Sequence, residues 1–302
     1  MANDVFAEEV PALLEPSRFL PLKVTPLMPT FGAEIEDIDL TAPLSDEVRT
    51  LLRNAWTAFG VVIFPGQPKL SIDQHLAVAS IFGEPDTGSP FVEKATSQVD
   101  VITTDGNRPP VTNLWHSDNT TLAEPSIGTM IQIQDGPQVG GNTSWASTVK
   151  AYRCLSEPMK RYLDGVTAVH YWNARGHKEP TYLSQARDEA YHLDLLKNIP
   201  PRSWPIVRAH PVTGEKALYV NETYTTYIEG VHVYESKAIL DFLYSWIRIP
   251  EFYVTHHWKA NDVAVWDNFQ VQHYGLADYK THRVNQRVTF GLHAADRSTA
   301  SR

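Results

Sequence analysis

The first ordered pattern of hydrophobic and polar positions along the chain predicts an amphipathic helix followed by a buried strand. Apolar residues recur at helical spacing over residues 48–59, a hydroxyl cap precedes them at Ser45, and Gly60 ends the pattern. The compact β-branched run at residues 61–64 then predicts a buried strand. Residues 71–82 predict a second helix that packs against this strand.

From about residue 98 the pattern changes to short β runs separated by turn residues. These runs lie at residues 99–103, 129–134, 166–171, 206–210, 218–220, 252–255, 263–266 and 288–292. Many short strands favour a mainly β fold with flanking helices, namely a double-stranded β-helix (a jelly-roll, cupin-like barrel). A Rossmann sheet would instead show regular alternation of strand and helix. Further helices are expected at about 148–164 and 235–247.

The domain organisation follows from these patterns. Residues 23–296 are expected to form one domain, which follows an irregular, proline-interrupted arm at residues 1–22 and precedes a tail at residues 297–302. A chain of 302 residues with 42% hydrophobic content is sufficient for a sizeable core. Residues 174–203 are polar, charged and bounded by prolines, which is typical of a lid or binding loop.

Charge and cysteine content narrow the class of partner. The formal net charge of −9, without a basic run, argues against a nucleic acid or an anionic membrane and favours a small molecule. The single cysteine, Cys154, excludes an internal disulfide and fits a reducing compartment. Because no segment has the pattern of a leader or a membrane span, we expect a cytoplasmic protein.

The most informative motif is His116-x-Asp118, preceded by Trp115. Side chains of an extended segment alternate between its two faces, so this imidazole and this carboxylate would lie on the same face and could meet one metal ion. Alone, the pair is a weak signal, because His-x-Asp occurs often by chance.

A second cluster changes this assessment. Residues 265–268, Val-Trp-Asp-Asn, lead through Gln272 to His273, and Arg283 and Arg287 follow. A distant histidine completes a facial triad of two imidazoles and one carboxylate, which leaves three adjacent positions open on an octahedral iron(II) ion. A 2-oxo acid cosubstrate and dioxygen would take these positions. A forked arginine and a hydroxyl suit the distal carboxylate of such a cosubstrate.

These motifs resemble the taurine dioxygenase and 2,4-dichlorophenoxyacetate dioxygenase family of 2-oxoglutarate-dependent oxygenases, from about residue 20 to residue 293. The matching elements are Trp-His-x-Asp at 115–118, Gly-Gly-Asn-Thr at 140–143, Leu-Tyr-Val-Asn-Glu at 218–222, Trp-Asp-Asn at 266–268, Gln-His-Tyr at 272–274 and the arginines at 283 and 287. The resemblance implies an Fe(II)-dependent dioxygenase that oxidises a small organic substrate, foremost by hydroxylation, with 2-oxoglutarate and O2 as cosubstrates. Succinate and CO2 would be released.

The resemblance also implies roles for individual residues. His116, Asp118 and His273 match the catalytic iron ligands. Thr143 and Arg283 match the hydroxyl and the arginine that hold the distal carboxylate of 2-oxoglutarate.

Other matches leave more than one interpretation open. Arg287 matches a residue that faces the substrate's anionic end in sulfonate-oxidising members. Because the spacing from His273 is one residue shorter than in taurine dioxygenase, the roles of Arg283 and Arg287 are interchangeable at this point. Asp267 and Asn268 fit either support for the strand that presents His273 or ordinary turn chemistry.

Positions that should face the substrate depart from the taurine pattern. Ser89 and Thr112 stand where the taurine enzyme has a histidine and an asparagine, and Tyr224 matches one of its phenylalanines approximately. Arg287 and Arg175 favour a substrate with a carboxylate, sulfonate or sulfate. We therefore expect a small anionic substrate other than taurine.

Alternative classes remain at this point. A zinc-dependent hydrolase or lyase would use the same ligands but would have no need for Thr143 and Arg283. A related halogenase would lack the metal carboxylate, whereas Asp118 is present. A non-catalytic β-barrel binding protein does not require an intact triad. The family resemblance also implies a homo-oligomer, a dimer or a tetramer.

Overall fold

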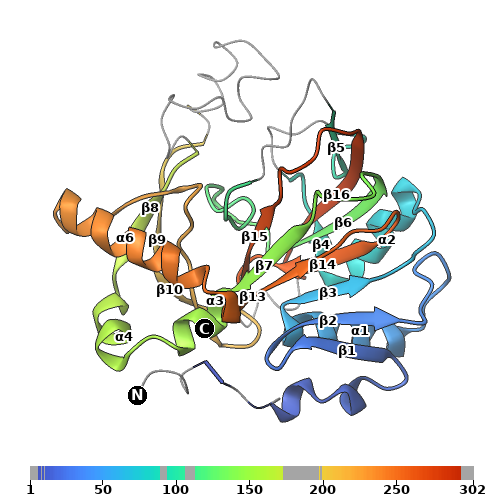
Figure 1. The fold of residues 1–302 in the computed structure, drawn as a ribbon, viewed down its shortest axis with the longest axis horizontal. Coiled ribbons are helices and arrows are strands. Elements are labelled where there is room, and N and C mark those ends of the chain that lie inside the picture. The colour runs from blue at the N-terminus through green and yellow to red at the C-terminus, as the bar shows by residue number, and fades with distance from the viewer. Residues whose placement is uncertain are drawn as a thin grey trace.

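The architecture is mainly β, as the sequence predicts, with helices on its outer faces (Figure 1). The structure is a computed structural model, and it describes residues 6, 7, 9, 11–88, 94–105, 113–172, 197 and 199–293. In these ranges, no helix combines the length and the apolar character needed to cross a lipid bilayer.

An eight-stranded sheet forms the centre of the fold. Its strands, in spatial order, are β1 (Lys23–Met28), β2 (Phe31–Glu36), β3 (Val61–Phe64), β14 (Val263–Asp267), β6 (Gly128–Asp135), β16 (Arg283–Gly291) and β4 (Glu84–Pro85), and β5 (Asp100–Thr104) also pairs with β16. Strand β14 lies between β3 and β6 and is buried along its whole length, because both of its faces are covered.

Three smaller sheets complete the described strands. Their spatial orders are β13 (Tyr253–His256), β7 (Thr143–Ser147), β15 (Val271–Gly275); β12 (Thr225–Ile228), β8 (Thr167–His170), β9 (Arg202–Pro205); and β10 (Val207–Ala209), β11 (Lys216–Leu218). In the first of these, the register sets His273 of β15 opposite Trp145 of β7. The register also sets Gly275 opposite Thr143, so two predicted site residues lie on neighbouring strands.

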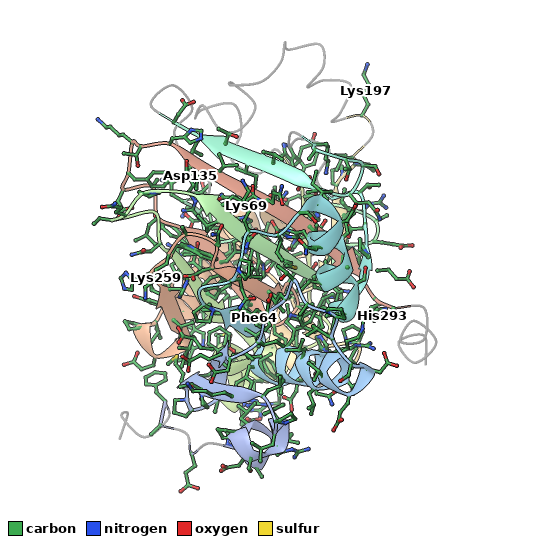
Figure 2. All side chains as sticks on the ribbon, turned by 90° about the vertical axis from the view of Figure 1, so that its right-hand side faces the viewer. Phe64, Lys69, Asp135, Lys197, Lys259 and His293 are labelled. Carbon is green, nitrogen blue, oxygen red and sulfur yellow. The ribbon has the colours of Figure 1, made fainter. Side chains whose placement is uncertain are left out.

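Two apolar layers cover the opposite faces of the large sheet. Helices α1 (Asp46–Phe59) and α2 (Ile72–Phe82) cover one face, and Phe64 of β3 belongs to that layer. Ile63, the preceding residue, packs in the other layer with Trp145 of β7, because strand side chains alternate. Figure 2 shows the side chains that fill the space around Phe64. The large sheet is thus sandwiched between helices and the β13–β7–β15 sheet.

The remaining helices lie at the other side of the molecule, next to β8, β9 and β10 (Figure 1). They are α3 (Thr148–Arg153), α4 (Glu157–Leu163) and α6 (Val233–Ile247). The fold also contains three short 3-10 helices, η1 (Ala12–Leu14), η2 (Pro16–Phe19) and η5 (Pro250–Phe252). The helical structure expected at 148–164 is confirmed, but it is divided into two helices, α3 and α4. Ser156 caps a new helix there, and Pro158 in its first turn lacks the N–H that a continuous helix would need.

The boundaries of three segments differ from the expected ones or lie outside the described residues. The expected irregular arm contains η1 and η2, because Leu14 and Phe19 pack into the core beside α1. Strand β16 starts at Arg283, before the predicted apolar run at 288–292; the pattern did not predict its first half because four of the first five residues are polar. Residues 174–196 and 198 of the expected lid and the tail at 297–302 lie outside the described residues.

Buried histidines predict acid sensitivity of the fold. Burial lowers the pKa of His75 to about 4 and that of His170 to about 3. In the unfolded chain, a histidine has a pKa of about 6.5. Between that pH and the lower pKa of the folded state, these two histidines bind protons only in the unfolded state. The free energy of unfolding should therefore fall with decreasing pH, by up to about 1.4 kcal/mol per pH unit and histidine.

Calorimetric melting temperatures between about pH 7.5 and pH 4.5 check this dependence. His75→Gln, which cannot titrate, should show a shallower decrease than the wild type. Equal slopes for the two proteins would contradict the prediction.

Candidate metal centre and cosubstrate pocket

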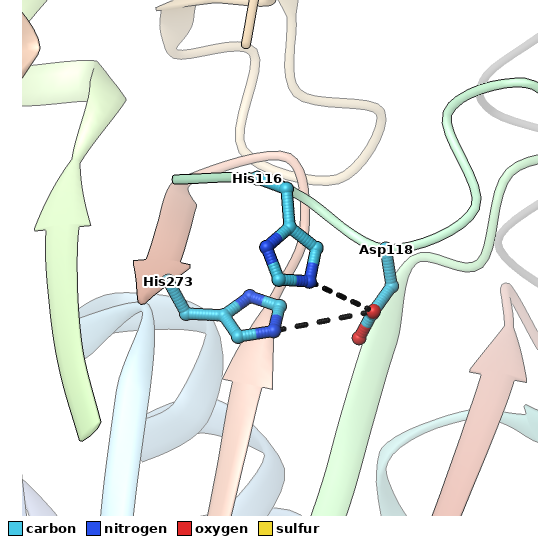
Figure 3. Close-up of side chains that lie close together, drawn as sticks. All are labelled: His116, Asp118 and His273. Atoms are coloured by element: carbon cyan, nitrogen blue, oxygen red, sulfur yellow. Dashed lines mark ion pairs between the residues drawn. The ribbon is translucent and has the colours of Figure 1, made fainter. Parts of the chain in front are cut away.

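His116, Asp118 and His273 lie together in the interior of the protein (Figure 3). His116 Nε2 is 3.8 Å and His273 Nε2 is 4.0 Å from the same oxygen, Asp118 Oδ1. One potential ligand atom of each residue lies within 4.8 Å of the others. The structure thus brings together the three residues that the sequence identified as candidate metal ligands.

Backbone pairing sets the two histidines side by side. His116 and His273 form an isolated antiparallel bridge, in which each backbone N–H donates to the other's carbonyl at N···O distances of 3.1 and 2.8 Å. The extended conformation predicted for the His-x-Asp motif ends there. Asp118 enters a turn in which Asn119 has a positive φ of 58°. This turn places the carboxylate near both imidazoles.

The protonation states of the three groups suit a divalent cation. Burial lowers the pKa of His116 and lowers that of His273 to about 3, so both imidazoles are neutral at pH 7. Burial alone would raise the pKa of Asp118, but the nearby His273 and Arg287 side chains outweigh it and lower this pKa to about 2. Two neutral imidazoles and one carboxylate are the donor set of non-haem iron(II) sites.

Hydrogen bonds orient two of the three candidate ligands. His116 Nδ1 bonds to the carbonyl of Leu114 at 2.7 Å, which leaves the Nε2 lone pair for a metal ion. Thr129 Oγ1 donates to Asp118 Oδ2 at 2.7 Å, so that oxygen is occupied and Oδ1 faces the imidazoles. Asn268 accepts from the Asp118 backbone N–H at 3.2 Å and donates to Thr129 Oγ1 at 3.0 Å.

Ring packing orients the third candidate ligand. The ring of His273 lies 4.7 Å from that of Trp266 and 4.1 Å from that of His116, centroid to centroid. Its Nδ1 has no hydrogen-bond partner among the described residues. Packing between two rings therefore replaces the hydrogen bond that fixes His116.

Asp267 and Asn268 have different roles, so both earlier interpretations apply. Asn268 contacts Asp118 and supports the metal centre. Asp267 organises the turn between β14 and β15, because its Oδ1 accepts the backbone N–H groups of Phe269 and Gln270. Its Oδ2 accepts from His210 Nε2 at 2.8 Å inside the protein.

Arg283 is a buried guanidinium held by neutral acceptors. Its Nε donates to Asn285 Oδ1 at 2.9 Å, and its Nη1 donates to the carbonyl of Gly141. The residue is 6% exposed, and burial lowers its pKa. No carboxylate pairs with it in the described ranges. Because an unpaired buried charge is unfavourable, this side chain is suited to an anionic ligand.

A pocket lies at Arg283 and is also lined by Gly141 and Trp258. Gly141 has φ +67°, and a Cβ there would lie 2.9 Å from Arg283 Nη1, so any other residue would strain the backbone and displace the guanidinium. Trp258 Nε1 donates to Thr143 Oγ1 at 2.9 Å. An indole N–H cannot accept, so the hydroxyl hydrogen of Thr143 remains for another acceptor.

Trp258 was not among the residues identified from sequence. Its ring centroid lies 5.9 Å from the guanidinium carbon of Arg283, so it connects the two predicted cosubstrate residues. The Thr143 hydrogen bond depends on a pairing between residues far apart in the chain. In the sequence, the only indication of this contact is that Trp258 closely follows the predicted strand at 252–255.

The surroundings of Arg287 differ from those of Arg283. Its Nε and Nη2 donate to Asp100 Oδ2 at 2.9 and 2.6 Å, and its Nη1 donates to Asp118 Oδ1 at 3.4 Å. Asp100 is 1% exposed and also pairs with Lys94. Protein carboxylates thus contact Arg287 on two sides.

The other predicted substrate residues are only partly described. The ring of Tyr224 lies 6.2 Å from that of His116 in an edge-on arrangement and 5.4 Å from that of Trp172. Ser89, Thr112 and Arg175 lie outside the described residues, so their roles stay predictions.

The fold and the donor set define the class, a mononuclear iron(II)- and 2-oxoglutarate-dependent oxygenase. A family model described as "Taurine catabolism dioxygenase TauD, TfdA family" matches residues 23–289. The chain belongs to this family and is an alpha-ketoglutarate-dependent dioxygenase that uses ferrous iron. The hydrolase, halogenase and binding-protein alternatives are set aside.

Individual relatives support this assignment. The chain is 29% identical over 279 residues to an alpha-ketoglutarate-dependent sulfate ester dioxygenase of Pseudomonas putida, with 92% of each chain covered. It is 32% identical over 285 residues to the alpha-ketoglutarate-dependent 2,4-dichlorophenoxyacetate dioxygenase of Cupriavidus pinatubonensis, covering 87% of this chain and 96% of the relative. A taurine dioxygenase structure from Burkholderia xenovorans matches with a TM-score of 0.74 at 30% identity and 89% coverage of each chain.

The hydrogen bond between Thr129 and Asp118 generates a prediction about metal affinity. Thr129→Val should weaken Mn(II) binding about 10-fold, because Asp118 Oδ2 loses the donor that orients the carboxylate. Thr129→Ser, which keeps the hydroxyl, should bind nearly as tightly as the wild type. Anaerobic titration followed by the electron paramagnetic resonance of free Mn(II) measures both, and equal affinities for Val and wild type would refute this role.

Proposed function

We propose that the protein hydroxylates a small anionic organic molecule other than taurine, with iron(II), 2-oxoglutarate and dioxygen, inside a jelly-roll barrel. The proposal rests on the interior cluster of His116, Asp118 and His273. The same fold also holds a buried arginine, Arg283, that has no carboxylate partner in the described ranges. Relatives named for a sulfate ester and for 2,4-dichlorophenoxyacetate support an anionic substrate.

In this proposal, His116 Nε2, Asp118 Oδ1 and His273 Nε2 hold the iron(II) ion. When bound, the ion allows one oxygen atom of O2 to enter the substrate C–H bond and the other to enter 2-oxoglutarate, which leaves as succinate and CO2. The protein holds the ligands in fixed geometry through Leu114 and Thr129. Burial of all three ligands keeps bulk water away from them.

Arg283 and Thr143 serve the distal carboxylate of 2-oxoglutarate in this proposal. The guanidinium is oriented by neutral acceptors, so its charge remains available for a dianionic cosubstrate. The hydroxyl of Thr143 accepts from Trp258 and keeps its own hydrogen for a carboxylate oxygen. This assignment favours Arg283 over Arg287 as the cosubstrate arginine, because two protein carboxylates contact Arg287.

The jelly-roll barrel is part of the same proposal. It is supported by the apolar layer between the large sheet and the β13–β7–β15 sheet, since two facing sheets with a shared interior are its basic arrangement. Tyr224 lies close enough to His116 to flank the substrate. The single domain at 23–296, the cytoplasmic location and the homo-oligomer stay predictions.

Removal of one ligand tests the function directly. His116→Ala or Asp118→Ala should abolish Fe(II) binding and consumption of 2-oxoglutarate while the far-ultraviolet circular dichroism stays that of the wild type. Anaerobic iron reconstitution followed by succinate measurement gives the result. The proposal would be wrong if either variant kept wild-type iron content.

The cosubstrate assignment predicts a separate effect. Arg283→Gln should weaken the binding of N-oxalylglycine, an unreactive analogue of 2-oxoglutarate, by about 10- to 100-fold, because a charge-assisted pair is lost. Its Mn(II) affinity should not change. Lys259→Gln, which removes an exposed cation of the same pocket, is the matched control and should leave both affinities within about 3-fold. Calorimetric titration of the Mn(II)-loaded proteins measures the affinity for N-oxalylglycine. An unchanged affinity in Arg283→Gln would overturn the assignment.

A further inference from the structure

Asp100 forms an ion pair with Arg287, the arginine to which the sequence resemblance assigns the anionic group of the substrate. Arg287 offers two edges for carboxylates, the Nε–Nη2 side edge and the Nη1–Nη2 end. Asp100 Oδ2 accepts both N–H groups of the side edge at 2.9 and 2.6 Å. At the end of the guanidinium, Nη1 donates to Asp118 Oδ1 at 3.4 Å. A carboxylate of the protein therefore lies at each edge.

The pairing of Asp100 with Arg287 is built into the sheet. Strands β5 and β16 are antiparallel, and their register sets Asp100 directly opposite Arg287. Directly opposite residues project on the same face of a sheet, so backbone pairing alone holds the two side chains in contact. The sequence gives no sign of this pairing, because the two residues are far apart in the chain.

A second cation also holds Asp100 in place. Lys94 pairs with Asp100 Oδ1 and donates to the carbonyl of Thr87 at 2.6 Å. The Asp100 side chain is 2% exposed and that of Lys94 is 26% exposed. If a ligand displaced Asp100 from Arg287, a buried carboxylate would lose one of its two cations, which is strongly unfavourable.

We propose that Asp100 is a specificity-determining residue that occupies the anion-binding edge of Arg287 and thereby excludes compact sulfonates and carboxylates from the position beside Asp118. An additional anion there would meet two buried carboxylates, and like charges repel strongly in a site shielded from water. Anions whose charged group ends farther from the metal centre do not meet this repulsion. The inference deepens the proposed function and rests on it.

Methanesulfonate is the probe for this exclusion, because it is a compact monoanion. It is titrated calorimetrically into the wild type and Asp100→Asn, each loaded with Mn(II) and N-oxalylglycine. The wild type should show no saturable binding up to about 10 mM, whereas Asp100→Asn should bind at least about 10-fold more tightly, since the amide keeps the shape and removes the charge. The double variant Asp100→Asn/Arg287→Met should not show this higher affinity, because methanesulfonate would bind to Arg287.

A matched control and a second variant keep the test decisive. Asp135→Asn removes an exposed carboxylate from β6, a strand that also pairs with β16, and should gain no affinity. Asp100→Ser serves if Asp100→Asn does not fold. A purely structural ion pair predicts lower melting temperatures without any gain in anion affinity, and that result would overturn the proposal. Arg287-dependent binding of methanesulfonate to the wild type, below about 1 mM, would also overturn it.

The controls separate this inference from the proposed function. N-oxalylglycine must bind the Mn(II)-loaded wild type before any methanesulfonate is added. Failure of that step contradicts the proposed function itself. Normal N-oxalylglycine binding, combined with an unchanged methanesulfonate affinity in Asp100→Asn, contradicts only the role of Asp100.

Discussion

The structure depends on a single buried carboxylate whose two oxygens have different tasks. Asp118 Oδ2 is held by Thr129, and Asp118 Oδ1 faces the Nε2 atoms of both histidines. The large sheet supplies this arrangement from three neighbouring strands, with Thr129 on β6, Arg287 on β16 and Asn268 directly after β14. A stiff, doubly covered sheet thus fixes the orientation of the one charged metal ligand.

The two arginines of β16 have the same side chain but different partners. Arg283 is oriented by a carbonyl and a side-chain amide, and no carboxylate among the described residues pairs with it, which supports its proposed role toward the dianionic cosubstrate. Arg287, four residues later on the same face, contacts Asp100 and Asp118. Charge compensation therefore distinguishes Arg283, the proposed cosubstrate arginine, from Arg287 more clearly than sequence spacing does.

The sequence predicted the features that are local or carried by motifs. Helix α1 and strand β3 were confirmed because their apolar periodicity and the Ser45 cap are local signals. Strand β7 was missed because its run Thr-Ser-Trp-Ala-Ser is largely polar and buried by its neighbours. Trp258 and Asp100 were missed because their roles depend on Thr143 and Arg287, and strand register rather than sequence proximity creates those contacts.

A crystal structure with Mn(II) and N-oxalylglycine bound is the decisive experiment. We expect the ion between His116 Nε2, Asp118 Oδ1 and His273 Nε2, at about 2.0 to 2.3 Å from each. We also expect the distal carboxylate of the analogue to contact Arg283 and Thr143. An ion bound elsewhere, or a distal carboxylate paired with Arg287, would show that the proposed site is wrong.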